Sequence, residues 1–261
     1  MWGAARRFEA WFVIPGAIGL FAWSMLALDA GGVRPSAFCA SGTSWPQLWS
    51  SFGVALVFNS PAKLVADWAL MVAAMMSPLL LAPLRHVWER SFARRRARAT
   101  LLFVAGYAAA WMMAGVVLQA IALAALWAMP APAIALGLAA AAAIGWQVSP
   151  AKQWCLNRCH RRPRLAAFGA AADVDALSFG LSNGAACVGS CCALMLLMLL
   201  MGSGHFAAMI AVTLFVFAER LENPAPLAWR LRGAGKTLRI AAAQARMRLA
   251  PRGGISEVLP Q

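Results

Sequence analysis

Charged residues are scarce in this sequence of 261 residues. They make up 12% of the chain, and hydrophobic residues make up 62%. A soluble domain has about 25% charged and roughly 45–50% apolar residues. This composition argues against a soluble enzyme and predicts that the lipid bilayer is the main solvent and first partner of the fold.

Acidic residues and histidines are also few. The sequence has 9 Asp and Glu against 23 Lys and Arg, and 3 His. Because the basic residues stand at the ends of apolar runs, we assign their charge to membrane orientation and expect no nucleic acid partner. The histidines stand near the ends of these runs, which does not support a haem held between two histidines. Serines in the runs lack the His or acidic partners that an intramembrane hydrolase would need, which argues against that class of enzyme.

Six apolar runs predict membrane helices. The sixth is short and is expected to use residues 219–221 at the interface. The runs cover residues 8–28, 64–84, 101–129, 131–148, 177–201 and 205–218. The predicted fold class is therefore all-α, a polytopic membrane helical bundle of about six transmembrane helices.

The positions of the basic residues predict the orientation of this bundle. With the N-terminus in the cytoplasm, every Lys and Arg except Arg34 and Lys63 falls in a cytoplasmic loop or terminus. Cytoplasmic loops of membrane proteins carry such an excess of positive charge. Because an odd number of helices would destroy the agreement, we predict that both termini are cytoplasmic.

Three regions follow from this pattern. Residues 1–63 contain the first transmembrane helix and an outer loop, residues 64–222 a five-helix core, and residues 223–261 a basic cytoplasmic tail. The apolar stretch 48–58 of the outer loop is either a helix on the membrane face or an irregular loop. The tail is either an amphipathic helix on anionic lipid or disordered.

The fourth run, rich in Ala and Gly over residues 131–145, offers little bulk to lipid. Small side chains let neighbouring helices approach closely. We therefore expect this helix to lie inside the bundle.

Two cysteines follow the fourth run, at the expected cytoplasmic face. Cys155 and Cys159 are spaced i,i+4, which places them on one helix face with Cβ atoms about 5–6 Å apart. Two thiolates at this spacing can hold one ion, and the flanking Lys152, Arg158 and Arg161 are expected to lower the thiol pKa values. The alternative is ordinary packing of buried cysteines.

A second set of sulfur atoms lies in the fifth run. Cys187, Cys191 and Met195 follow i,i+4,i+8 and so form one stripe, with Cys192 beside it. Glycines at 180, 184 and 189 would let another helix approach this stripe. The second run could face it with Asp67, a functional candidate because it is acidic within a span, and with Met71, Met75 and Met76.

Soft thiolate and thioether ligands favour Cu(I), whereas Zn²⁺ would more often use His or carboxylate. Thioethers also bind without losing a proton, which suits a site away from water. The alternative is again packing, because Met commonly fills membrane cores and Cys behaves as a small hydrophobe. The candidate metal ligands are Cys155, Cys159, Cys187, Cys191, Cys192, Met195 and Asp67.

The chain resembles a bacterial family of predicted metal-binding integral membrane proteins. The residues that carry the resemblance are Asp67 to Pro78, Gly106, Tyr107, Trp111, Trp146, Gln147, Lys152, Cys155, Cys159, Pro163, Gly184, Cys187, Gly189, Cys191, Met195 and Glu219. The chain departs from the family pattern at Asn183, where the family has His, and at Ser190 and Cys192. The resemblance implies metal binding and a place in the bacterial plasma (inner) membrane.

The leading hypothesis is an integral membrane protein that handles Cu(I) as a chaperone, carrier or transport accessory, and a metal-delivery protein is the expected partner. A membrane thiol redox protein or sensor is the alternative, although no Cys-x-x-Cys motif is present. A third reading is a structural assembly subunit that binds no metal.

Overall fold

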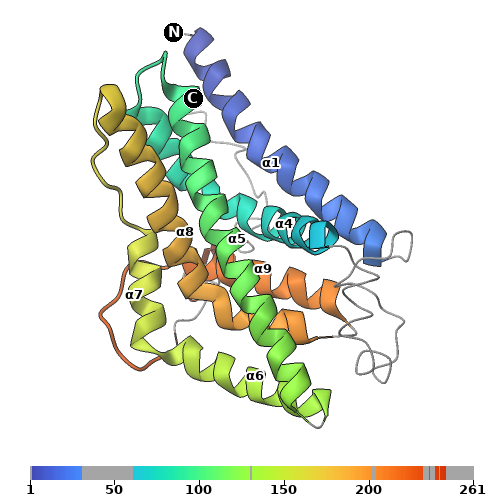
Figure 1. Ribbon diagram of the computed structural model, residues 1–261. Coiled ribbons are helices and arrows are strands. Elements are labelled where there is room, and N and C mark those ends of the chain that lie inside the picture. The colour runs from blue at the N-terminus through green and yellow to red at the C-terminus, as the bar shows by residue number, and fades with distance from the viewer. Residues whose placement is uncertain are drawn as a thin grey trace, which may run out of the picture.

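The computed structural model describes residues 2–30, 61–129, 131–201 and 204–231, together with positions 235, 239–240 and 242–244. Within these ranges every regular element is a helix, as predicted (Figure 1). The outer-loop stretch 48–58 lies outside the described residues. The helices are α1 (Trp2–Ala30), α4 (Pro61–Arg90), α5 (Arg96–Ala128), α6 (Pro132–Val148), α7 (Pro150–Cys159), α8 (Gly169–Leu200) and α9 (His205–Leu221).

Four helices are long and apolar enough to cross a membrane, namely α1, α4, α5 and α8. The pair α6 and α7 counts as a fifth if it forms one span broken by a bend of 64°. Helix α9 has 17 residues, fewer than the about 20 that a full crossing needs. The sequence-based expectation of several membrane helices therefore holds for four to five of them.

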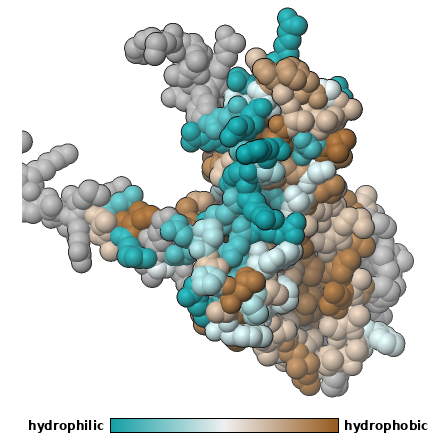
Figure 2. Space-filling model, turned by 90° about the vertical axis from the view of Figure 1, so that its left-hand side faces the viewer, coloured by the Kyte–Doolittle hydropathy of each residue, from teal (hydrophilic) through white to brown (hydrophobic). Residues whose placement is uncertain are grey.

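Three helices extend beyond the apolar runs into charged sequence, which is basic in α4 and α5 and acidic in α8. Helix α4 continues to Arg90, and α5 and α8 begin at Arg96 and Gly169. Asp173 joins the extension of α8 to the start of α5, because its carboxylate binds the guanidinium groups of Arg95, the N-cap of α5, at 2.7 Å and Arg98 at 2.8 Å. Figure 2 shows hydrophilic residues gathered on the upper and central part of one face, beside a continuous apolar surface.

Helices α5 and α8 are in close backbone contact through glycine. A Cβ atom built on Gly180 would lie 2.1 Å from the carbonyl oxygen of Phe103, and one on Gly106 would lie 2.5 Å from that of Leu177. Only residues without a side chain permit this approach. The prediction that Gly180 accommodates a neighbouring helix is confirmed, and the contact fixes which face of α8 turns toward α5.

Helix α6 lies at the edge of the bundle, so the expectation that it lies inside is wrong. One stripe, Ala135, Ala139 and Ala143, is buried. On the opposite face Leu138 and Ile144 are exposed. The side chains of α6 are small enough for a helix inside the bundle, but only its alanine stripe packs against the rest of the chain.

The segment after α9 is held along α7 by two side-chain amides. Asn157 donates to the carbonyl of Ala225 at 2.7 Å and accepts from its N–H at 3.1 Å. Gln153 makes the same pair of bonds with Ala228, at 2.7 and 3.1 Å. Residues 225–231 are not helical, whereas the described positions 235, 239–240 and 242–244 are; the expected choice between a helix on anionic lipid and disorder beyond Leu227 stays a prediction.

Candidate metal centre

Cys187 stands at the meeting point of three helices. Its Sγ lies 3.8 Å from the Sδ of Met76 on α4. From α5, the hydroxyl of Tyr107 donates to the same Sγ at 3.2 Å. The side chain is 1% exposed, so the thiol is held away from solvent between a thioether and a phenol.

Cys191 lies one turn further along α8, on the same face. Its thiol donates to the carbonyl of Cys187 at 3.1 Å, and the two thiols also interact with each other. Met195 follows at the next turn and is 0% exposed. The predicted stripe of three sulfur atoms is thus present and faces the interior.

Thioethers from three helices surround this stripe in one buried cluster. They include the predicted α4 group, which faces α8 as expected, and also a residue of α9. The buried methionines of the cluster are Met71, Met75, Met76, Met195, Met198 and Met209. Soft donors from α4, α8 and α9 therefore share one water-excluded volume.

The α7 pair lies closer to the α8 cysteines than the sequence suggested. Cys155 packs against α8, since a Cβ built on Gly189 would lie 2.5 Å from its Sγ. Its thiol interacts with that of Cys192, and the Cys159 thiol interacts with that of Cys187. The two sulfur motifs therefore adjoin each other across the α7–α8 contact.

Helix α7 is rich in polar residues and follows the 64° bend, so we treat it as lying outside the apolar spans. Burial raises the pKa of Cys159 to about 12 and also raises the pKa of Cys155. The nearby arginines favour the thiolates, but burial outweighs them. The expectation of lowered thiol pKa values at this pair is wrong.

Among the described residues there is no group of three or more His, Cys, Asp or Glu side chains placed to hold a metal ion. This pattern does not favour a zinc site, which needs about four such ligands. A pair of thiols with thioether neighbours is the donor set that the fold does provide. Asp67 is half-buried on α4, one turn before Met71, and stays a predicted ligand.

A buried ion pair beside the cluster was not predicted from the sequence. Lys152 of α7 and Glu219 of α9 are 2.6 Å apart. Both belong to the motif of the resemblance, and Tyr107 does as well. The signal in the sequence was their charge at the ends of apolar runs. We attributed the charge of Lys152 to orientation and to an effect on the thiol pKa values, and we placed Glu219 at the membrane interface.

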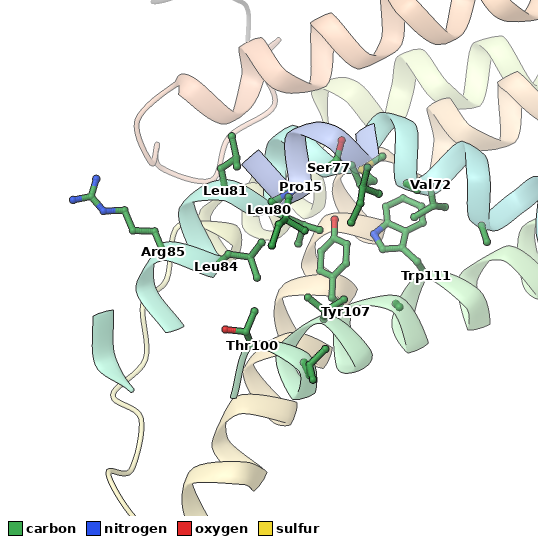
Figure 3. Close-up of a pocket in the computed structure, with 18 of the residues that line it drawn as sticks. Pro15, Val72, Ser77, Leu80, Leu81, Leu84, Arg85, Thr100, Tyr107 and Trp111 are labelled. Atoms are coloured by element: carbon green, nitrogen blue, oxygen red, sulfur yellow. The ribbon is translucent and has the colours of Figure 1, made fainter. Parts of the chain in front are cut away.

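An apolar cavity of about 380 Å³ lies between α1, α4 and α5 (Figure 3). Pro15, Leu80 and Leu84 line it, and Tyr107 and Trp111 enter from α5. Through the hydroxyl of Tyr107, this wall is connected to Cys187. The lining suits hydrocarbon and offers no row of polar groups for a hydrated ion.

Comparison with known proteins gives one match. Neither a curated protein nor a solved structure matches the chain. A family model described as PpoB2, copper chaperone, matches residues 65–242, which is more than half of the chain and includes all of α4 to α9 except the first residues of α4.

Proposed function

We propose that the chain, which belongs to the PpoB2 copper chaperone family, is an integral membrane protein that holds Cu(I) as its cargo and passes it to a partner protein. Copper handling follows from the family. The oxidation state, the binding residues and the membrane topology are our inferences from the site described above.

The observation that carries the proposal is the approach of Cys187 Sγ to Met76 Sδ, 3.8 Å apart although 111 residues separate them. With Cys191 one turn away, two thiolates and a thioether are available to one ion. Cu(I) accepts two or three soft ligands, and thiolate and thioether are the donors it prefers. The dry surroundings favour an ion whose charge the thiolates can balance.

The α7 pair extends the site toward the basic side of the bundle. Cys155 and Cys159 adjoin the α8 cysteines, and Cys155 remains partly exposed. We propose that this pair is the exchange point at which the ion enters or leaves, whereas Cys187 and Cys191 store it. A second thiol pair next to the first lets an ion move by replacing one ligand at a time.

The proposed topology has six spans with both termini in the cytoplasm. The arrangement of helix ends supports it. In Figure 1 the end of α1, the start of α4 and the ends of α5 and α8 lie on the right-hand side, whereas α1, α5 and α8 begin toward the top of the picture. Such alternation is expected of antiparallel membrane helices joined by short loops, with α9 as a short last span.

Copper titration of the purified full-length protein tests the site. In reducing buffer, with a Cu(I) chelator as competitor, we expect Cys187→Ser or Cys191→Ser to remove most of the binding, because one thiolate with a thioether is a weaker donor set. Met198→Leu is the matched control, since it removes a buried thioether of the same helix.

The proposal fails if the double variant Cys187→Ser, Cys191→Ser remains folded and keeps the copper content of the wild type. Counting free thiols in the same samples separates copper binding from the alternative redox function, in which Cys187 and Cys191 would form a disulfide.

A further inference from the structure

Arg220 brings a guanidinium group to the edge of the sulfur site. The residue as a whole is half-buried, but its Nε and Nη2 atoms are buried and have no hydrogen-bond partner among the described residues. Its carbonyl oxygen lies 3.1 Å from Nε2 of His160 on α7, which fixes the end of α9 there. The electrostatic neighbours of the guanidinium include Cys187, Cys159 and Cys191.

The other charges at this end of α9 are already balanced. Lys152 and Glu219 form their own ion pair at 2.6 Å, and Tyr107 contributes a neutral hydroxyl. In the part of the chain that the structure describes, no carboxylate forms an ion pair with Arg220. Buried charges are normally paired, but among the described residues the buried guanidinium nitrogens of Arg220 have no protein partner.

We infer that Arg220 is the counter-cation of the loaded site and makes it select monovalent over divalent soft ions. The inference rests on the proposed function. When Cu(I) binds, the thiols of Cys187 and Cys191 release their two protons to solvent, and two thiolates with one Cu⁺ carry one negative charge. The guanidinium cancels that charge, so the loaded site is neutral.

A divalent ion reverses this balance. Two thiolates with Hg²⁺ are already neutral, and the positive charge of Arg220 then stays uncompensated in a buried place. Because an unpaired buried charge is strongly unfavourable, the same guanidinium that stabilises bound Cu(I) or Ag(I) disfavours bound Hg(II). Arg220 thus acts on selectivity through charge, without contributing a ligand.

The test compares Ag(I), a monovalent probe that is inert to oxidation, with Hg(II). Both affinities are measured by chelator competition on the full-length protein, for wild type, Arg220→Gln and Arg220→Lys. We expect Arg220→Gln to lower the ratio of Ag(I) to Hg(II) affinity by at least about tenfold. Arg220→Lys keeps the charge and should retain most of the ratio. Arg230→Gln, which changes an exposed arginine, is the matched control.

A ratio reports selectivity even if part of a variant preparation is unfolded, since both ions are measured on the same sample. An equal loss for both ions, or an unchanged ratio, in Arg220→Gln would overturn the inference. If the wild type binds neither ion through Cys187 and Cys191, the proposed function itself fails. Cys-dependent binding with an unchanged ratio would reject the role of Arg220 alone.

A second measurement uses the ligands instead of the arginine. In Cys191→Met, one thiolate and a thioether with Ag⁺ are neutral without help. Arg220→Gln should then cost much less Ag(I) affinity than it does in the wild type, a coupling that a double-mutant cycle measures. If the losses of Ag(I) affinity from the two substitutions are additive, Arg220 does not act as a counter-cation.

Discussion

The ammonium Nζ of Lys152 and the carboxylate Oε1 of Glu219 lie 2.6 Å apart, with side chains 0% and 1% exposed. Lys152 also donates to the Gln147 amide and lies over the ring of Phe215, 5.4 Å from its centroid. An ion pair so remote from water is costly to break, because the surviving partner is left buried and charged. It therefore holds α9 against α7 and keeps Arg220 beside the thiols.

Breaking this pair from one side should destabilise the fold strongly. We expect Lys152→Met or Glu219→Gln alone to lower the free energy of unfolding by about 3–5 kcal/mol, and the double variant to lose less than either single one. Thermal unfolding in detergent measures the change. Arg85→Ala is the control, because the Arg85–Glu89 pair is 56% and 48% exposed and should contribute under about 1 kcal/mol. Losses that simply add would show that the two charges act independently.

The glycine contact between α5 and α8 should tolerate no methyl group. Gly180→Ala would place a Cβ 2.1 Å from the Phe103 carbonyl oxygen, and backbone cannot move aside cheaply, so we expect a loss of about 1–3 kcal/mol or more. Gly137→Ala has open space around it and should be neutral or stabilising by up to about 1 kcal/mol. Denaturation of both variants in detergent compares them. If Gly180→Ala and Gly137→Ala are equally stable, the close contact between α5 and α8 does not lie at Gly180.

The two cysteines of α7 should differ in reactivity. Cys159 is buried and its pKa is raised to about 12, so its reactive thiolate is rare at neutral pH and should increase about tenfold per pH unit below that value. Cys155 is partly exposed. In metal-free protein in inverted vesicles, an impermeant maleimide should label Cys155 first, and Cys155→Ser should remove most labelling. Faster labelling of Cys159 would contradict its burial.

Reporter fusions test the six-span topology. Fusions after Ser91, after Arg162 and at the C-terminus should report cytoplasm, because basic residues flank all three sites and such residues are retained inside. Fusions at Thr43 and Ser203 should report the outer side. A cytoplasmic result at Thr43 would exclude the proposed arrangement.

The sequence predicts the helices well and their ends less well. Apolar runs mark only the parts of a helix that suit lipid. The start of α5 is basic and the start of α8 is acidic, and Asp173 of α8 joins the two through Arg95 and Arg98. Hydropathy cannot predict such polar extensions, because ion pairs between distant residues stabilise them.

The candidate site was predicted along α8, with the α4 methionines expected to face it, but the contributions of α5, α7 and α9 were not predicted. The i,i+4 spacing of Cys187 and Cys191 follows from helix geometry alone. That Met76 and Tyr107 reach the same sulfur depends on how α4 and α5 pack, which no local pattern contains. Arg220 was counted with the cytoplasmic charges, and its place beside the thiols became visible only with the end of α9 fixed on α7.

The side-chain amides of Gln153 and Asn157 form hydrogen bonds only with main-chain groups of the segment after α9. The edge of a β-sheet binds an added strand in the same way. These hydrogen bonds do not depend on the side chains of the segment that they attach. Leu227, Trp229 and Leu231, 54%, 74% and 67% exposed, project from it at alternate positions. Their identities can change without loosening the attachment, whereas a proline at Ala225 or Ala228 would remove a donated N–H. Folding therefore constrains the backbone of residues 225–231 and not their exposed side chains. The identity of these side chains is set by what surrounds the protein.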